Sequence, residues 1–82
     1  MDKKIASKEF IEGWLTYLAI AFPKNEENFW GLLAERLQCY GCSELEVSKA
    51  VYSIIDYTNK EFLTIAEILQ PILIARELNI VD

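Results

Sequence analysis

The chain has 82 residues, of which 52% are hydrophobic, and a formal net charge of −5. This length allows one domain, and the acidic balance argues against a protein that binds the phosphate backbone of nucleic acid. The sequence has no histidine, which removes Ser-His-Asp catalysis and the commonest metal ligand. We therefore expect a single non-enzymatic domain over residues 1–82 that uses no metal or cofactor.

The first segment predicts a short leader followed by a helix. Residues 1–6 are expected to be a flexible leader. Ser7 can cap a helix that runs to about Phe22, where Pro23 ends it. Beyond Thr16 the segment is apolar on every side, which predicts that its C-terminal half lies at the centre of the fold. The expected buried stripe consists of Ile11, Trp14, Leu15, Leu18 and Phe22.

A second amphipathic helix is predicted over residues 25–41. Asn25 is expected to cap it, and Gly41 can take the left-handed conformation that ends a helix. Only Gly41 and Cys42 separate it from the next helix, which predicts that the two helices are neighbours. The expected apolar face consists of Phe29, Leu32, Leu33, Leu37 and Tyr40.

The third helix is expected to begin with a capping box, because Glu46 follows Ser43 at the required three-residue spacing. It runs to about Tyr57 and places Glu46 on its solvent-facing side. The predicted buried stripe consists of Val47, Ala50, Val51, Ile54 and Ile55.

A loop over residues 58–63 leads to a second capping box, Thr64 with Glu67. The helix that follows contains Pro71, so it is expected to be kinked or restarted there. The predicted fold class is therefore all-α: a compact four-helix bundle with the last helix kinked or restarted at Pro71. Apolar residues that exceed the needs of so small a core follow the proline and are the predicted partner-binding surface: Ile74, Leu78, Ile80 and Val81.

Cys39 and Cys42 form a C-x-x-C pair, the one short motif with possible chemistry. A structural zinc needs four ligands, so only a dimer that pools two such pairs could hold one. Cys39 falls in the last turn of a helix, where the helix dipole disfavours a reactive thiolate. Both cysteines are therefore interpreted as small apolar residues in a turn.

The aromatic side chains carry no interleaved lysine or arginine, so base stacking on nucleic acid is not expected. We expect most of them in the core or at an interface. They include Trp14, Trp30, Tyr17, Tyr40, Tyr52 and Tyr57. No signal peptide and no bilayer-length apolar run is present, so a cytoplasmic protein is expected.

Four short segments together resemble the N-terminal domain of phage replicative-helicase loader/inhibitor proteins. They are Tyr17 to Pro23, Phe29-Trp30 with Leu33, Ala50-Val51 with Ile54-Ile55, and Thr64 to Ile68. The resemblance covers roughly residues 10 to 70. It departs from the family at Leu63, where the family usually has proline, and the family's flexible C-terminal extension, which engages the helicase, has no counterpart before Asp82.

Two functions follow as expectations. The resemblance implies a non-enzymatic protein-interaction domain of phage or prophage type that acts on a replicative helicase. The alternative is a small structural protein that forms a homodimer through its apolar C-terminal segment, residues 72–81.

Overall fold

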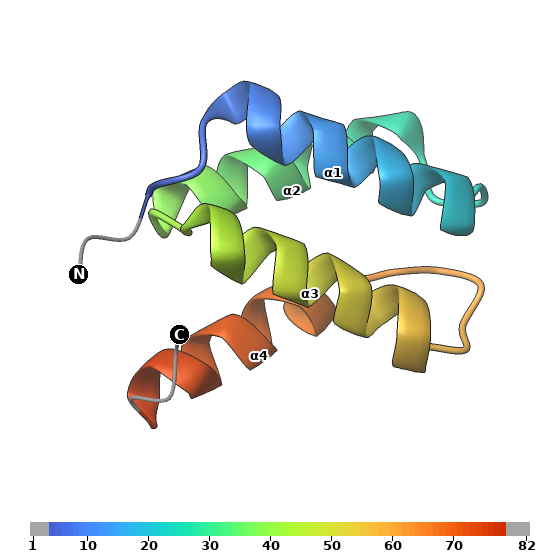
Figure 1. Cartoon of the computed structure of the whole chain (residues 1–82). Helices are drawn as coiled ribbons and strands as arrows, with labels where there is room; N and C mark the ends of the chain where they lie inside the picture. Colours follow the sequence, from blue (N-terminus) through green and yellow to red (C-terminus); the bar gives the residue numbers. More distant parts are fainter. Residues whose placement is uncertain (1–3, 79–82) are drawn as a thin grey trace.

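The computed structural model describes residues 4–78, which form four helices and no β-strand (Figure 1). These are α1 (Lys8–Ala21), α2 (Glu27–Cys39), α3 (Glu44–Tyr57) and α4 (Ile65–Glu77). The prediction of an all-α four-helix fold is confirmed. None of the described helices combines the length and the apolar character that a membrane span requires.

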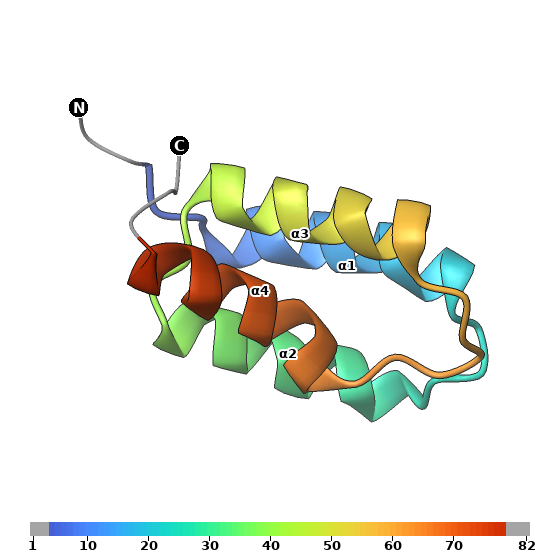
Figure 2. The same cartoon turned by 90° about the horizontal axis from the view of Figure 1, so that it is seen from below.

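The helices pack in an order that differs from their order in the chain. α1 and α3 run side by side in the same direction, α2 packs on α1, and α4 packs on α3 (Figures 1 and 2). Among the described residues, α2 and α3 are not one of the closely packed pairs. The prediction that their short connection makes them closely packed neighbours was therefore wrong, because α1 packs on both of them. Gly41, whose φ is +60°, takes the left-handed conformation predicted for the end of α2.

The N-terminal segment lies against the turn between α2 and α3. The Ala6 amide donates to the carbonyl of Cys42 at 2.9 Å, and the Glu44 amide donates to the carbonyl of Lys4 at 2.9 Å. Ala6 is buried, and Ile5 forms an isolated bridge with Ser43. The predicted flexible leader therefore needs correction over residues 4–6, while residues 1–3 lie outside the described part.

Three of the four helices begin at the capping residues predicted from the sequence. Ser7, Ser43 and Thr64 are N-caps whose side chains accept from the backbone, and the last two complete capping boxes. These bonds satisfy amides that a helix start otherwise leaves without a partner.

Asn25 was predicted to cap α2, and this prediction was wrong. Glu26 is the N-cap of α2 and makes no side-chain capping bond. The Asn25 side chain instead donates to the carbonyl of Leu63 and accepts from the amide of Leu63, both at 2.9 Å. This pair of bonds fastens the loop between α3 and α4 to the turn between α1 and α2, and Leu63 itself is buried.

One core joins all four helices. It contains most of the predicted stripes, and its fully buried side chains include Ile11, Leu18, Leu33, Leu37, Val47, Val51 and Ile68. The prediction for the end of α1 was wrong, because Tyr17 is 51% exposed and Ile20 is 74% exposed. Of the described helices, α2 and α3 are the ones that pack closely on α1, and Tyr17 and Ile20 lie on a side of α1 that is open to solvent. Leu32 and Ile55 were also placed in the core wrongly and are exposed.

α4 continues through Pro71 as one helix, Ile65–Glu77, so the predicted restart is excluded. Pro71 lies on the exposed side of α4, while Ile68, Leu69 and Ile72 are buried. The proline ring thus lies away from the core that the helix covers.

The end of α4 is held by an ion pair with the start of α3. Arg76 Nε donates to Glu46 Oε2, and Arg76 Nη2 donates to Glu46 Oε1, each at 2.7 Å. The same guanidinium donates to the carbonyls of Tyr40, at 3.0 Å, and Gly41, at 3.4 Å. The hydrogen bond to Glu46 raises the pKa of Arg76, so the guanidinium stays charged. The side chain of Glu46 is 5% exposed and that of Arg76 is 32% exposed, so the prediction that Glu46 faces solvent was wrong.

Replacement of Arg76 by Met should lower the free energy of unfolding by about 3 kcal/mol, because the buried Glu46 carboxylate loses its guanidinium. Urea unfolding followed by circular dichroism measures this change. The double variant Arg76→Met with Glu46→Gln should lose less stability than Arg76→Met alone, because glutamine keeps the capping oxygen and carries no charge.

Lys24→Met is the matched control, because it removes a 2.7 Å ion pair with Glu61 whose two side chains are largely exposed. That change should cost about 1 kcal/mol or less. If Arg76→Met and Lys24→Met lower the free energy of unfolding equally, the importance assigned to the ion pair between Arg76 and Glu46 is contradicted.

Candidate interaction surfaces

Half of the sequence-predicted partner surface lies within the described residues. Ile74 is 53% exposed and Leu78 is 61% exposed. They are four residues apart at the end of α4, which places them on one side of the helix. Ile80 and Val81, the other two predicted residues, lie outside the described part.

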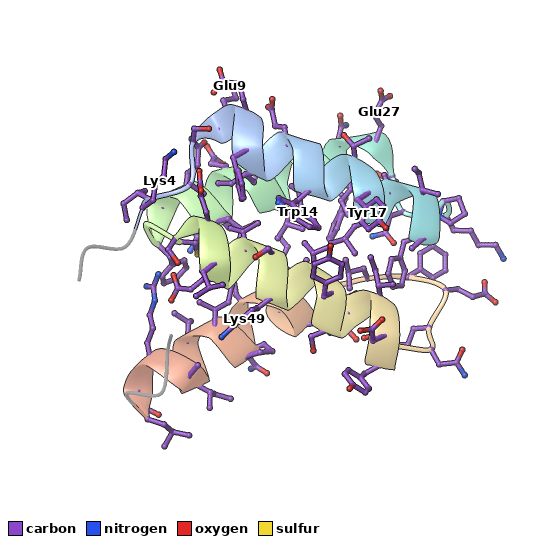
Figure 3. The ribbon with its side chains drawn as sticks, viewed as in Figure 1. Lys4, Glu9, Trp14, Tyr17, Glu27 and Lys49 are labelled. Carbon is purple, nitrogen blue, oxygen red and sulfur yellow. The ribbon has the colours of Figure 1, made fainter. Side chains whose placement is uncertain are left out.

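A second exposed apolar surface lies between α1 and α3. The Trp14 ring contacts Tyr52 of α3, with 5.1 Å between ring centroids, and Tyr17, with 6.0 Å, both edge to face. Phe10 extends this series at 6.4 Å from Trp14. Figure 3 shows Trp14 and Tyr17 on the side of α1 that faces α3. We call the shallow hollow of about 530 Å³ at this place the aromatic groove; it is lined by Glu9, Phe10, Gly13, Trp14, Tyr17 and Tyr52.

Gly13 leaves the aromatic groove open. It lies inside α1, where glycine is less stable than alanine by about 0.5–1 kcal/mol. A Cβ at this position would meet no atom within 4 Å, so no packing in the fold requires a glycine. The open space beside Trp14 is available to an atom of a partner.

A third surface, which we call the acidic groove, runs between α1 and α2. One part is a hollow of about 270 Å³ lined by Leu15, Trp30, Gly31 and neighbouring residues. A second part, of about 380 Å³, shares Glu12, Gly31 and Ala34 with the first and extends toward Lys8 and Gln38. Three glutamates line the two parts together: Glu12, Glu27 and Glu35.

The two cysteines occupy different environments and form no disulfide. Cys42 is buried in the turn, as predicted, and burial raises the pKa of its thiol. Its protonated form therefore stabilises the fold below the ordinary thiol pKa, and this contribution is lost as the pH rises. Cys39 is exposed at the end of α2, so its prediction as a buried apolar residue was wrong. Within residues 4–78, no three His, Cys, Asp or Glu side chains are grouped so as to hold a metal ion.

The polar side chains buried in the described part are all used by the fold. Every buried side-chain nitrogen or oxygen there has a hydrogen-bond partner. Ser43 and Glu46 serve the cap of α3 and the ion pair to α4. A buried polar group aimed at a substrate is not found among them. The aromatic groove is mainly aromatic and apolar, whereas the acidic groove combines apolar residues with charged and polar ones.

Sequence reasoning missed both grooves as sites. It assigned the aromatic residues to the core or an interface, and it gave Gly13 and Gly31 no role. The available signal was a glycine inside each of two otherwise good helices, where helix propensity disfavours it. Comparisons with family models, curated proteins and solved structures find no match for this chain.

Proposed function

We propose that this chain is a non-enzymatic protein-interaction domain that contacts its partner through the aromatic groove. The observation that carries the proposal is the edge-to-face cluster of Trp14, Tyr17 and Tyr52 beside the open position at Gly13. Tyr17 and Tyr52 are each 51% exposed, so a partner could bury a large further area of ring surface.

The chemistry of these side chains supports a protein partner. Tryptophan and tyrosine are enriched among the few residues that dominate binding energy at protein interfaces. Their rings lose little conformational entropy on binding, and the contacts between Trp14 and its neighbours already limit their motion. Glu9 at the edge of the groove supplies a polar rim.

The resemblance to phage helicase loader/inhibitor domains suggests a specific partner, a hexameric replicative helicase. In that role the ATPase of the helicase performs the chemistry, and this domain changes the assembly or loading of the helicase by contact. The proposal for the partner depends on the resemblance, whereas the proposal for the contact surface depends on the aromatic groove.

Gel filtration with the replicative helicase of the source organism or its host tests the proposal. The wild-type domain should migrate with the helicase at micromolar concentrations. Gly13→Leu should weaken binding by about tenfold or more, because the new side chain fills the aromatic groove. The same change should not reduce stability, since leucine favours the helix and the space at Gly13 is open.

Ser53→Leu is the matched control, because it adds the same side chain at an exposed position of α3 outside the groove. It should leave binding unchanged. Absence of co-migration for the wild-type domain would contradict the helicase proposal, and equal binding by the two leucine variants would contradict the role of the aromatic groove.

A second candidate function is a homodimer formed through the end of α4. The specific observation is the exposure of Ile74 and Leu78 on one side of the helix. Two-fold symmetric dimers are the commonest assemblies of soluble proteins, and each copy would present the same apolar surface.

Light scattering distinguishes this alternative. If the end of α4 forms the contact, the wild-type chain is a dimer, and Ile74→Glu with Leu78→Glu yields a monomer with unchanged helix content by circular dichroism. The charged side chains would repel across the two-fold axis without affecting the core. A wild-type monomer, or a dimer that survives both substitutions, would rule out this contact.

A further inference from the structure

We propose that the acidic groove between α1 and α2 binds a basic amphipathic helix of a partner protein. This inference rests on the proposed function and adds to it a second contact surface, with the chemistry of the partner segment that binds there. Its apolar side chains would enter the groove, and its lysine or arginine side chains would face the glutamates along the edges.

The shape of the groove fits a helix. Its base is formed by Leu15 and by small residues of both helices, among them Ala19 and Ala34. From Glu27 to Gln38, which line its two ends on α2, the groove extends about 16 Å at the rise of an α-helix. Three turns of a bound helix cover this length, and small residues let two helix axes approach closely.

Gly31 lies where the two parts of the groove meet. It is inside α2, where glycine weakens a helix, and a Cβ there would meet no atom within 4 Å. The packing of α1 on α2 therefore does not require glycine at this position. A side chain larger than hydrogen would project into the groove, so glycine keeps the space open for a partner.

The charge distribution favours a basic occupant. Within residues 4–78, four carboxylates form ion pairs: Glu44, Glu46, Glu61 and Glu67. Among the same described residues, the carboxylates that take no part in these ion pairs are concentrated on α1, α2 and the cap between them, and the two others are Asp56 and Glu77. Those on α1, α2 and the cap are Glu9, Glu12, Glu26, Glu27 and Glu35.

Glu27 of α2, which lines the acidic groove, lies on the side of the molecule away from α3 and α4 (Figure 3). Lys8 is the one basic residue that lines the groove, and it lies near one end. Apart from Lys8 at this end, the carboxylates make the electrostatic potential along the groove more negative, which attracts a positively charged segment.

Trp30 adds a second means of recognising a cation. Its ring lines the groove next to Glu27 and is held edge to face by Phe29, with 4.9 Å between centroids. A lysine or arginine side chain that pairs with Glu27 could also lie over this ring, an arrangement that strengthens cation binding.

The test uses a synthetic helical peptide of leucine and lysine, about as long as three to four helical turns, with leucine on one face. A matched peptide has glutamate in place of every lysine. Trp14→Phe leaves Trp30 as the sole tryptophan of the chain, and its fluorescence reports occupancy of the acidic groove. In this background Gly31→Leu blocks the groove, and Ser53→Leu adds the same side chain at an exposed position of α3 that lines neither groove.

The lysine peptide should change the Trp30 fluorescence and bind less tightly as salt is added, because exposed charges are screened. Gly31→Leu should weaken binding by about tenfold or more, while Ser53→Leu should not change it. Glu12→Gln with Glu27→Gln should reduce both the affinity and its salt dependence. The glutamate peptide should not bind.

Equal binding by the two leucine variants would overturn the inference, because the peptide would then be attracted by net charge alone. Equal binding of the glutamate peptide, or occupation of the groove by a second copy seen as dimerisation that Gly31→Leu abolishes, would also overturn it. If these tests fail while the helicase still binds in a manner sensitive to Gly13→Leu, the proposed function stands and only the basic helix is excluded.

Discussion

The bidentate ion pair between Arg76 and Glu46 is the interaction on which the rest of the arrangement depends. Glu46 also accepts from the amide of Ser43 and so completes the cap of α3. Arg76 reaches beyond Glu46 to the carbonyls of Tyr40 and Gly41 at the end of α2. One contact therefore joins the end of α4, the start of α3 and the turn after α2. The N-terminal segment pairs with the same turn, so the N-terminal segment, the end of α2, the start of α3 and the end of α4 meet at this end of the molecule.

This arrangement determines which surfaces remain open. α3 is covered by α1 and α4, whereas α1 is covered by α2 and α3 and leaves one long side in solvent (Figures 1 and 2). The two grooves lie along the two flanks of that side. The aromatic groove follows the contact of α1 with α3, and the acidic groove follows the contact of α1 with α2. A glycine that no packing requires lies in each groove, so both can admit a side chain from outside the domain.

Local features of the fold could be predicted from the sequence, because a capping box or a proline acts over a few residues. The starts at Ser7, Ser43 and Thr64 and the end of α1 before Pro23 are of this kind. The burial of Glu46 could not be predicted, because its partner Arg76 lies thirty residues along the chain. Helical spacing alone placed Glu46 on the solvent-facing side of its helix. Asn25 was misread for the same reason, because its bonds are to Leu63. The grooves depend on which helices become neighbours, and periodicity along one helix does not contain that information.

The central claim is that the exposed side of α1 and its two flanks are where this domain meets its partner. Amide resonances of the isotopically labelled domain, recorded while the replicative helicase is added, test it most directly, since a large partner broadens the signals of the residues it contacts. We expect selective broadening of the signals along α1 and along the sides of α2 and α3 that line the grooves, while the amide signals of Ile74 and Leu78 keep their intensity. Broadening confined to the end of α4, or signals that do not change at any helicase concentration, would contradict the central claim.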